Sequence, residues 1–141
     1  MRFMMFIKIQ PEVYAKQPEE MEPADFERMG RYNDELQKAG VLLALDGLQP
    51  PSAGARVEFG DDGRPSVVDG PYAEAKEIIG GYWIIQTKTK DEAVEWASRV
   101  PVSRGEVAVE LRQIFEMSDF PENVQAFFED QSPPEQTVDT L

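Results

Sequence analysis

Three segments of this chain, residues 2–10, 41–48 and 81–87, are apolar on both of the faces that a β-strand presents. Side chains of a strand alternate between its two faces, so a strand with apolar residues at both sets of positions has to be covered on both sides. We therefore predict a sheet that needs packing material on each of its faces. The first segment, at the start of the chain, is predicted to be central.

A helix is predicted between the first two strands. Apolar residues recur there at helical spacing, at Phe26, Met29, Tyr32 and Leu36. Pro23 suits the first turn of a helix, and Gly40 suits the position just past its end. These signals predict a helix over residues 23–39, preceded by a polar, proline-bounded connection.

A second helix and a last strand follow the third apolar segment. Residues 89–92, Thr-Lys-Asp-Glu, have the pattern of a capping box, in which the first and fourth side chains satisfy backbone groups at a helix start. Pro101 ends this helix. Val107, Val109 and Leu111 then alternate with polar residues, which predicts a half-exposed final strand.

A β-hairpin is predicted between the second and third apolar segments. Residues 56–59 and 65–68 have strand composition and flank the Asp62-Gly63 pair, a typical hairpin turn. The elements then follow the order β-α-β, hairpin, β-α-β. This order predicts an α+β fold with a ferredoxin-like antiparallel sheet, two helices on one face and an added surface hairpin, placed at an edge.

Two helices of this length cover one face of such a sheet. The other face is apolar as well, so we expect it to be buried against a second subunit. The sequence thus predicts a homodimer that packs through the sheet face.

Residues 69–77, Asp-Gly-Pro-Tyr-Ala-Glu-Ala-Lys-Glu, and residues 80–85, Gly-Gly-Tyr-Trp-Ile-Ile, carry a family resemblance. In this order they resemble the YCII-related family, in particular its DGPF-domain branch, whose members are mostly small bacterial proteins without an assigned activity. The resemblance covers residues 2–115 and implies the dimeric α/β-barrel superfamily, in which two ferredoxin-like sheets face each other. It names a family but no substrate.

The last part of the chain differs in charge from the rest. The formal net charge of the 141 residues is -13, and residues 116–141 contain seven acidic residues and no basic one. We therefore predict one domain over residues 1–115 and an acidic extension over 116–141. Phe120, Val124, Phe127 and Phe128 predict a short amphipathic helix that docks on the domain or on its partner. From about Asp130 onward we expect a mobile end.

Composition excludes several classes of function. The chain has no cysteine and no histidine, which removes thiolate nucleophiles, disulfides and the commonest general base and transition-metal ligand. The negative charge opposes binding to nucleic acids and to anionic membranes. No apolar segment is long enough to span a membrane, and the start of the chain reads as a strand and not as a signal peptide. We expect a cytoplasmic protein.

Asp69, Asp46 and Lys76 are the candidate catalytic residues. Gly70 and Pro71 form a stiff turn that would hold the Asp69 carboxylate toward a cleft, although Asp-Gly-Pro is also an ordinary turn in which Asp69 bonds its own backbone. Asp46 interrupts an apolar strand, so it is paired, functional or simply solvated at the strand end. Lys76 would bind an anionic group, or it forms surface ion pairs.

Tyr72, Tyr82, Tyr32 and Glu74 are the candidate substrate-binding residues. The tyrosines would line a pocket with a polar tip, or they are core or interface residues whose hydroxyl is satisfied. Asp46, Asp69 and Glu74 together offer the oxygen ligands that magnesium or calcium prefers, but their spacing matches no known binding loop. We expect no metal and no cofactor.

Two functions remain open. The first is a small-molecule acid/base enzyme of lyase or isomerase type, which uses carboxylates in a cleft beside the DGPY turn. The family's putative site pairs an aspartate with a histidine in several branches, and this chain has no histidine to take that place. The second is a non-catalytic ligand-binding or regulatory module. The resemblance implies an extracytoplasmic-function sigma factor as a partner of such a module, and a basic partner would suit the acidic extension.

Overall fold

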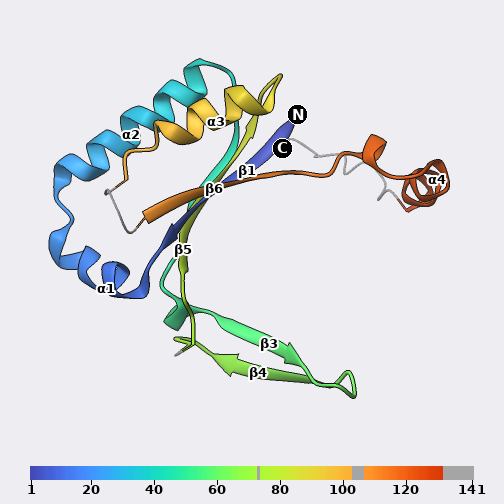
Figure 1. The fold of residues 1–141 in the computed structure, drawn as a ribbon, viewed down its shortest axis with the longest axis horizontal. Helices are drawn as coiled ribbons and strands as arrows, with labels where there is room; N and C mark the ends of the chain where they lie inside the picture. The colour runs from blue at the N-terminus through green and yellow to red at the C-terminus, as the bar shows by residue number, and fades with distance from the viewer. Residues whose placement is uncertain (73, 103–106, 132–141) are drawn as a thin grey trace, which may run out of the picture.

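The protein consists of a four-stranded antiparallel sheet with helices on one face, a separate β-hairpin and a C-terminal arm (Figure 1). The computed structural model describes residues 1–72, 74–102 and 107–131. The hairpin and the arm both project on the side of the sheet that lies away from the helices (Figure 1).

Six strands and four α-helices make up the described chain, with two short 3₁₀ turns, Pro51–Ala53 and Met117–Asp119. The strands are β1 (Arg2–Ile9), β2 (Leu42–Gly47), β3 (Ala55–Phe59), β4 (Pro65–Asp69), β5 (Ile78–Gln86) and β6 (Val107–Gln113). The helices are α1 (Pro11–Glu20), α2 (Pro23–Lys38), α3 (Lys90–Ser98) and α4 (Glu122–Asp130).

The main sheet has the strand order β2-β5-β1-β6, and every neighbouring pair is antiparallel. This is the order of a ferredoxin-like α+β fold, so the predicted fold class and the central position of the first strand are confirmed. In the register of β5, β1 and β6, Met5 lies opposite Trp83 on one side and opposite Leu111 on the other.

The core lies between this sheet and the helices α2 and α3. Its buried residues are Phe3, Met5, Tyr32, Leu36, Trp83, Ile85, Ala93 and Val100. The Tyr32 ring packs edge-on against Trp83, with ring centroids 5.7 Å apart, and its hydroxyl donates a 2.8 Å hydrogen bond to the carbonyl oxygen of Trp96. Strand and helix residues thus meet in one apolar layer.

The ends of the two main helices follow the sequence signals. Gly40, with a φ of 73°, ends α2, and the backbone N–H of Val41 donates to the carbonyl of Leu36, as in a Schellman motif. At the start of α3 the Thr89 hydroxyl accepts a 3.2 Å hydrogen bond from the Glu92 N–H. The predicted capping interaction is therefore present on the Thr89 side.

The prediction for residues between the first strand and α2 was wrong in one respect. The polar, proline-bounded connection is itself a helix, α1. Pro11 occupies its first turn, where a missing backbone N–H costs no hydrogen bond. Val13 and Tyr14 are half-buried on the domain, so tertiary contacts stabilise a helix with a weak apolar pattern of its own. Three helices, not two, therefore lie on the covered face.

The hairpin is confirmed as β3–β4, but it forms its own two-stranded sheet instead of joining an edge of the main sheet. Gly63, with a φ of 78°, lies in its turn, where glycine adopts this backbone conformation without strain. The predicted C-terminal helix is also confirmed, as α4, and it stands away from the body of its own domain (Figure 1).

The mobile end predicted from about Asp130 concerns mainly residues 132–141, which lie outside the described residues; Asp130 itself ends α4. Within the described ranges, no helix has both the length and the apolar character that crossing a membrane would take.

Candidate functional site

A cavity of about 1000 Å³ lies between the helical layer and the sheet, at the end of the sheet where β1 runs into α1. Its walls are mostly apolar, with Ile7, Leu45 and Trp83 from the sheet and Val13 and Met29 from the helices. Sites for small molecules are typically concave and apolar and have volumes of about 300–1,000 Å³. The cavity thus has the size and the character of a ligand site.

Several large apolar side chains that line this cavity are exposed to solvent. The exposed fractions are 63% for Phe26, 43% for Met21, 38% for Leu45 and 46% for Leu48. Apolar surface that stays in contact with water is unfavourable, by about 25 cal/mol for each Å². The cavity is therefore an open apolar hollow. A ligand that covered its exposed side chains would be bound favourably.

Few polar groups line the cavity, and most of them are paired. Asn33 on α2 accepts a 2.8 Å hydrogen bond through Oδ1 from the indole N–H of Trp83, which leaves its amide N–H groups to donate. Arg28 forms an ion pair with Asp25 on the same helix. The cavity thus presents hydrogen-bonding groups but little unpaired charge on its helical wall.

The Gly80-Gly81 pair explains how the strands come close together beside the cavity. A Cβ atom on Gly81 would lie 3.0 Å from the carbonyl oxygen of Asp46 on the neighbouring strand, and one on Gly80 would lie 2.9 Å from the Ile9 side chain. The register of β1 and β5 shifts at this point, so Gly80 occupies a bulge. The glycines let the neighbouring strands approach closely at the edge of the cavity.

Asp46 and Tyr82 form the polar pair that the sequence singled out as two separate candidates. They lie opposite each other on β2 and β5, and the Tyr82 hydroxyl donates a 2.5 Å hydrogen bond to Oδ2 of Asp46. This hydrogen bond, together with partial burial, raises the pKa of Tyr82. Tyr82 therefore stays protonated and holds the Asp46 carboxylate in one orientation.

The pair does not point into the cavity, although both residues border it. Neighbouring residues of a strand point to opposite faces of a sheet. Leu45 and Trp83 lie opposite each other and line the cavity on the helical side, so the side chains of Asp46 and Tyr82 lie on the open face. The cavity and the carboxylate are thus separated by the sheet.

The DGPY turn has a structural role that accounts for its glycine. Gly70 packs against the loop at residues 50–54, where an added Cβ would lie only 1.9 Å from the carbonyl oxygen of Pro51. The Gly70 N–H donates to the Gly54 carbonyl, and the Gly70–Pro71 peptide bond is cis. Asp69 ends β4 and is exposed, so its carboxylate is solvated and is not enclosed in a cleft.

Tyr72 and Glu74 are brought together by a residue that the sequence analysis did not single out, Arg56. The Arg56 guanidinium lies 4.4 Å from the centre of the Tyr72 ring and forms ion pairs with Glu74 and Glu58. The hydrogen bond from Arg56 lowers the pKa of Glu74. This cluster ties the turn to the base of the hairpin.

The remaining two candidates lie elsewhere. Tyr32 is buried in the core with its hydroxyl bonded, and burial raises its pKa to about 12. Lys76 is exposed after the turn. Among the described residues, no hydrogen bond or ion pair joins Asp46, Asp69 and Lys76, and no three acidic side chains are grouped closely enough to hold a metal ion.

The comparison with known families fits this fold. The YCII-related domain matches residues 1–118 of the chain. The chain belongs to the YCII-related domain family. An uncharacterized protein of Rhizobium meliloti (strain 1021) is 37% identical over 60 residues, which cover 43% of this chain and 48% of that protein. The aligned region thus spans about half the length of this curated relative, and the DGPF branch stays a prediction.

The cavity of this YCII-related domain was missed at the level of sequence. Phe26 and Met29 were recognised only as one face of a predicted helix, and Leu45 only as part of an apolar strand. Nothing in such a pattern distinguishes a residue that lines a hollow from one that packs in the core. Gly80-Gly81 marks a close approach of neighbouring strands beside the cavity, but such a pair does not by itself indicate a hollow.

Proposed function

We propose that this YCII-related domain binds a small, mostly apolar molecule in the cavity between its helices and its sheet. One observation carries the proposal: Met21, Phe26, Leu45 and Leu48 line one hollow and are all exposed to solvent. A bound apolar molecule would remove their surface from water.

The lining favours a neutral ligand with one or two polar atoms. Arg28 is neutralised by Asp25, so an anion would meet no unpaired cation on the described helical wall. The amide of Asn33 is fixed by Trp83 and offers a hydrogen-bond donor at a defined position. A ring system or short chain with a carbonyl or hydroxyl oxygen fits this set of groups.

A matched pair of variants tests the proposal. Phe26 lines the cavity and is 63% exposed, whereas Phe59 lies on the hairpin and is 73% exposed. We expect Phe26→Ser to weaken binding of the neutral fluorescent probe N-phenyl-1-naphthylamine about tenfold, because the apolar contact is lost, and Phe59→Ser to leave it unchanged. Equal effects of the two variants, or no binding by the unmodified protein, would contradict the proposal.

An acid/base enzyme is the second candidate, and the Asp46–Tyr82 pair is the observation that favours it. Oδ2 of Asp46 accepts the phenol hydrogen, which leaves the other oxygen to take a proton from a substrate on the open face. Both residues are in contact with solvent in the single chain. A second copy packed on the open face would shield this carboxylate from water, as a site for proton transfer requires.

This second candidate depends on the homodimer, which we propose on independent grounds. Met4, Phe6 and Ile84 lie on the face of the sheet without helices and are only half-buried. In the enzyme, Asp46→Asn would abolish turnover and leave the dimer and probe binding in the cavity intact. Asp69→Asn and Lys76→Met test the site predicted beside the DGPY turn in the same assay.

A regulatory module remains the alternative to both. It is supported by the acidic C-terminal extension, which would attract a basic protein such as the sigma factor implied by the resemblance. Cavity binding without any turnover, together with stable capture of a purified sigma factor, would favour this function over the enzyme.

A further inference from the structure

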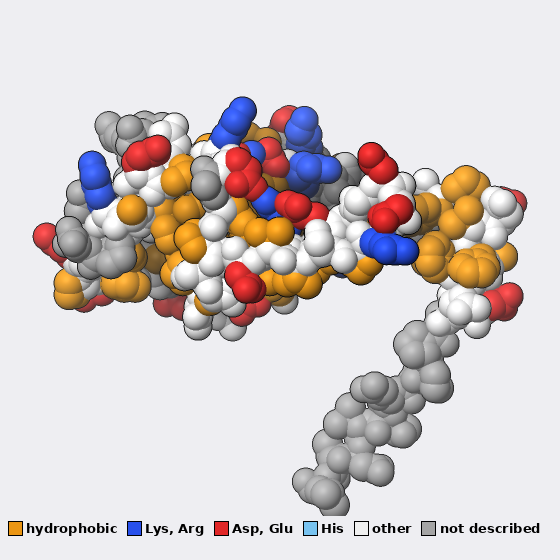
Figure 2. Space-filling view, turned by 90° about the horizontal axis from the view of Figure 1, so that it is seen from below, with side chains coloured by type: hydrophobic (Ala, Val, Ile, Leu, Met, Phe, Trp, Pro, Cys, Tyr) orange, Lys and Arg blue, Asp and Glu red, His pale blue; other side chains and the backbone are white. Residues whose placement is uncertain are grey.

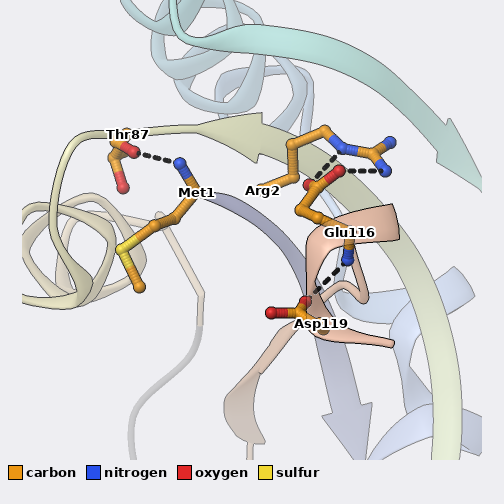
Figure 3. A network of polar contacts seen from close by, with 5 residues as sticks. All are labelled: Met1, Arg2, Thr87, Glu116 and Asp119. Atoms are coloured by element: carbon orange, nitrogen blue, oxygen red, sulfur yellow. Dashed lines mark hydrogen bonds and ion pairs between the residues drawn. The ribbon is translucent and has the colours of Figure 1, made fainter. Parts of the chain in front are cut away.

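The C-terminal arm, residues 115–131, leaves the domain in a direction fixed by polar contacts. Glu116 accepts two hydrogen bonds from Arg2, one of 2.7 Å from Nε and one of 3.2 Å from Nη2 (Figure 3). The Glu116 N–H in turn donates a 2.7 Å hydrogen bond to Asp119 (Figure 3). The hydrogen bonds from Arg2 lower the pKa of Glu116. The arm therefore begins as an ordered projection and not as a loose tail.

One side of this arm is aromatic, and part of it is exposed to solvent. Phe115 packs on Phe120 with ring centroids 5.1 Å apart, and Phe120 packs on Phe128 at 5.9 Å. The exposed fractions are 72% for Phe115 and 60% for Phe127. Figure 2 shows hydrophobic side chains gathered at the end of the molecule that the arm forms. Most of this arm lies beyond residue 118, where the family match ends.

The whole chain exposes much more surface than a compact monomer of its size. Its accessible surface is 10985 Å² for a mass of 15.9 kDa, whereas a compact protein of this mass exposes about 7,400 Å². An excess of this order, roughly 3,600 Å², is enough for what one subunit buries in a large obligate dimer, roughly 1,000–2,500 Å².

We propose that the arm packs its aromatic side on a second copy of this chain. Three apolar surfaces project to the same side of the sheet: the open face itself, the hairpin with Phe59 and Val67, and the arm (Figure 1). A second copy related by a two-fold axis is a single partner that covers all three, because each copy presents the same surfaces to the other. The open face also carries basic groups, such as Arg112, for the acidic residues of the arm.

This inference rests on the homodimer proposed above and adds what the arm does in it. The arm of one copy lies on the body of the other, so each domain is held by a segment of its partner. A segment that lies mostly outside the family match would then hold two YCII-related domains together. We call this contact between the arm and the partner's body the clasp.

Photo-crosslinking between full-length chains tests this directly. One sample carries p-benzoylphenylalanine in place of Phe127 at natural isotope abundance, and it is mixed with unmodified chain labelled with ¹⁵N. Contact across the dimer predicts crosslinked peptide pairs that contain one light and one heavy partner. The control places the same group at Lys38, at the end of α2 in the helical layer, where we expect no mixed pairs.

A second measurement reads the contribution of the arm to assembly. Phe127→Ser is expected to raise the dimer dissociation constant at least about tenfold in sedimentation equilibrium, because an aromatic anchor is lost from the interface. The matched control Glu122→Gln on the same helix is expected to leave it unchanged.

The outcomes separate the proposals. A dimer without light–heavy crosslinks, or one that Phe127→Ser does not weaken, would overturn the clasp and leave the sheet-face dimer standing. A chain that is monomeric at all concentrations would overturn both. Probe binding in the cavity is measured separately and depends on neither result.

Discussion

The two faces of the main sheet are built from the same strands, yet they differ in how well they are covered. On the helical face, Met5 and Ile85 have no exposed surface. On the open face, their direct neighbours Met4 and Ile84 are only half-buried. Both faces carry apolar residues, although the open face also carries charged ones such as Lys8 and Glu110. The helices of one chain therefore cover only one of the two apolar faces of its sheet.

The incomplete cover is informative on both sides. On the helical face the cover is interrupted by an apolar hollow, which is large enough for a small molecule. On the open face, Met4, Phe6 and Ile84 stay half-buried in the part of the chain that the structure describes, and the hairpin and the arm project on that side (Figure 1). A hollow suits a ligand, whereas a broad face suits another protein surface.

The largest effect is expected from two neighbouring isoleucines on β5. Ile85→Ala should lower the free energy of unfolding by about 2–5 kcal/mol, because it leaves a cavity in the core. Ile84→Ala should cost about 1 kcal/mol in dilute protein, because its side chain is only partly buried in one chain. Urea unfolding at low protein concentration measures both. Equal losses would mean that the two faces do not differ.

A charge on the open face should disrupt assembly strongly. Ile84→Glu is expected to raise the dimer dissociation constant at least about a hundredfold, because the interface would bury an unpaired carboxylate. Val94→Glu, at an apolar residue that is exposed on α3, is the control. Sedimentation equilibrium distinguishes the two, and an intact dimer of Ile84→Glu would place the interface elsewhere.

A smaller effect is expected from the buried tyrosine of the helical face. Tyr32→Phe removes the hydrogen bond to Trp96 and should cost about 1 kcal/mol at neutral pH. The raised pKa of Tyr32, about 12, means that its contribution is fully present below pH 10 and is lost as the pH rises through 12. The free energy of unfolding, measured from pH 8 to 12, should therefore fall less steeply with pH in the variant than in the unmodified protein. An unchanged alkaline slope would contradict this assignment.

The smallest effect is expected from the ion pairs of the open face. Lys8 contacts Glu77 at 2.7 Å and Glu110 at 3.3 Å, and its pKa is raised by both partners. Glu110→Gln leaves Glu77 in place, so the unfolding of dilute protein should not change measurably. A large loss of stability would show that this face is already shielded from water in the single chain.

Much of the fold was predictable because its signals are local. The apolar segments that became β1 and β5, together with Pro23 and Gly40 at the ends of α2, were sufficient to predict these elements. Helix α1 was not predictable in this way, because Val13 and Tyr14 give it only a narrow apolar side. It is stabilised by contacts that exist only after the sheet has formed.

The candidate site was less predictable, because a site depends on which side chains meet. Asp46 was found from the break in polarity along its strand, and its partner Tyr82 was named without the contact between them. Asp69 and Lys76 were named from the turn motif, and the structure shows that Gly70 of this motif packs against the loop at residues 50–54. The cavity depends on the distance between helices and sheet, which no local pattern encodes.

The central claim is that the two faces have different occupants: a small molecule on the helical side and a second copy on the open side. Native mass spectrometry of the full-length protein with N-phenyl-1-naphthylamine measures both at once. The account predicts a particle of twice the 15.9 kDa chain mass that carries one probe molecule per chain. A monomer, or a dimer that binds no probe, would contradict it.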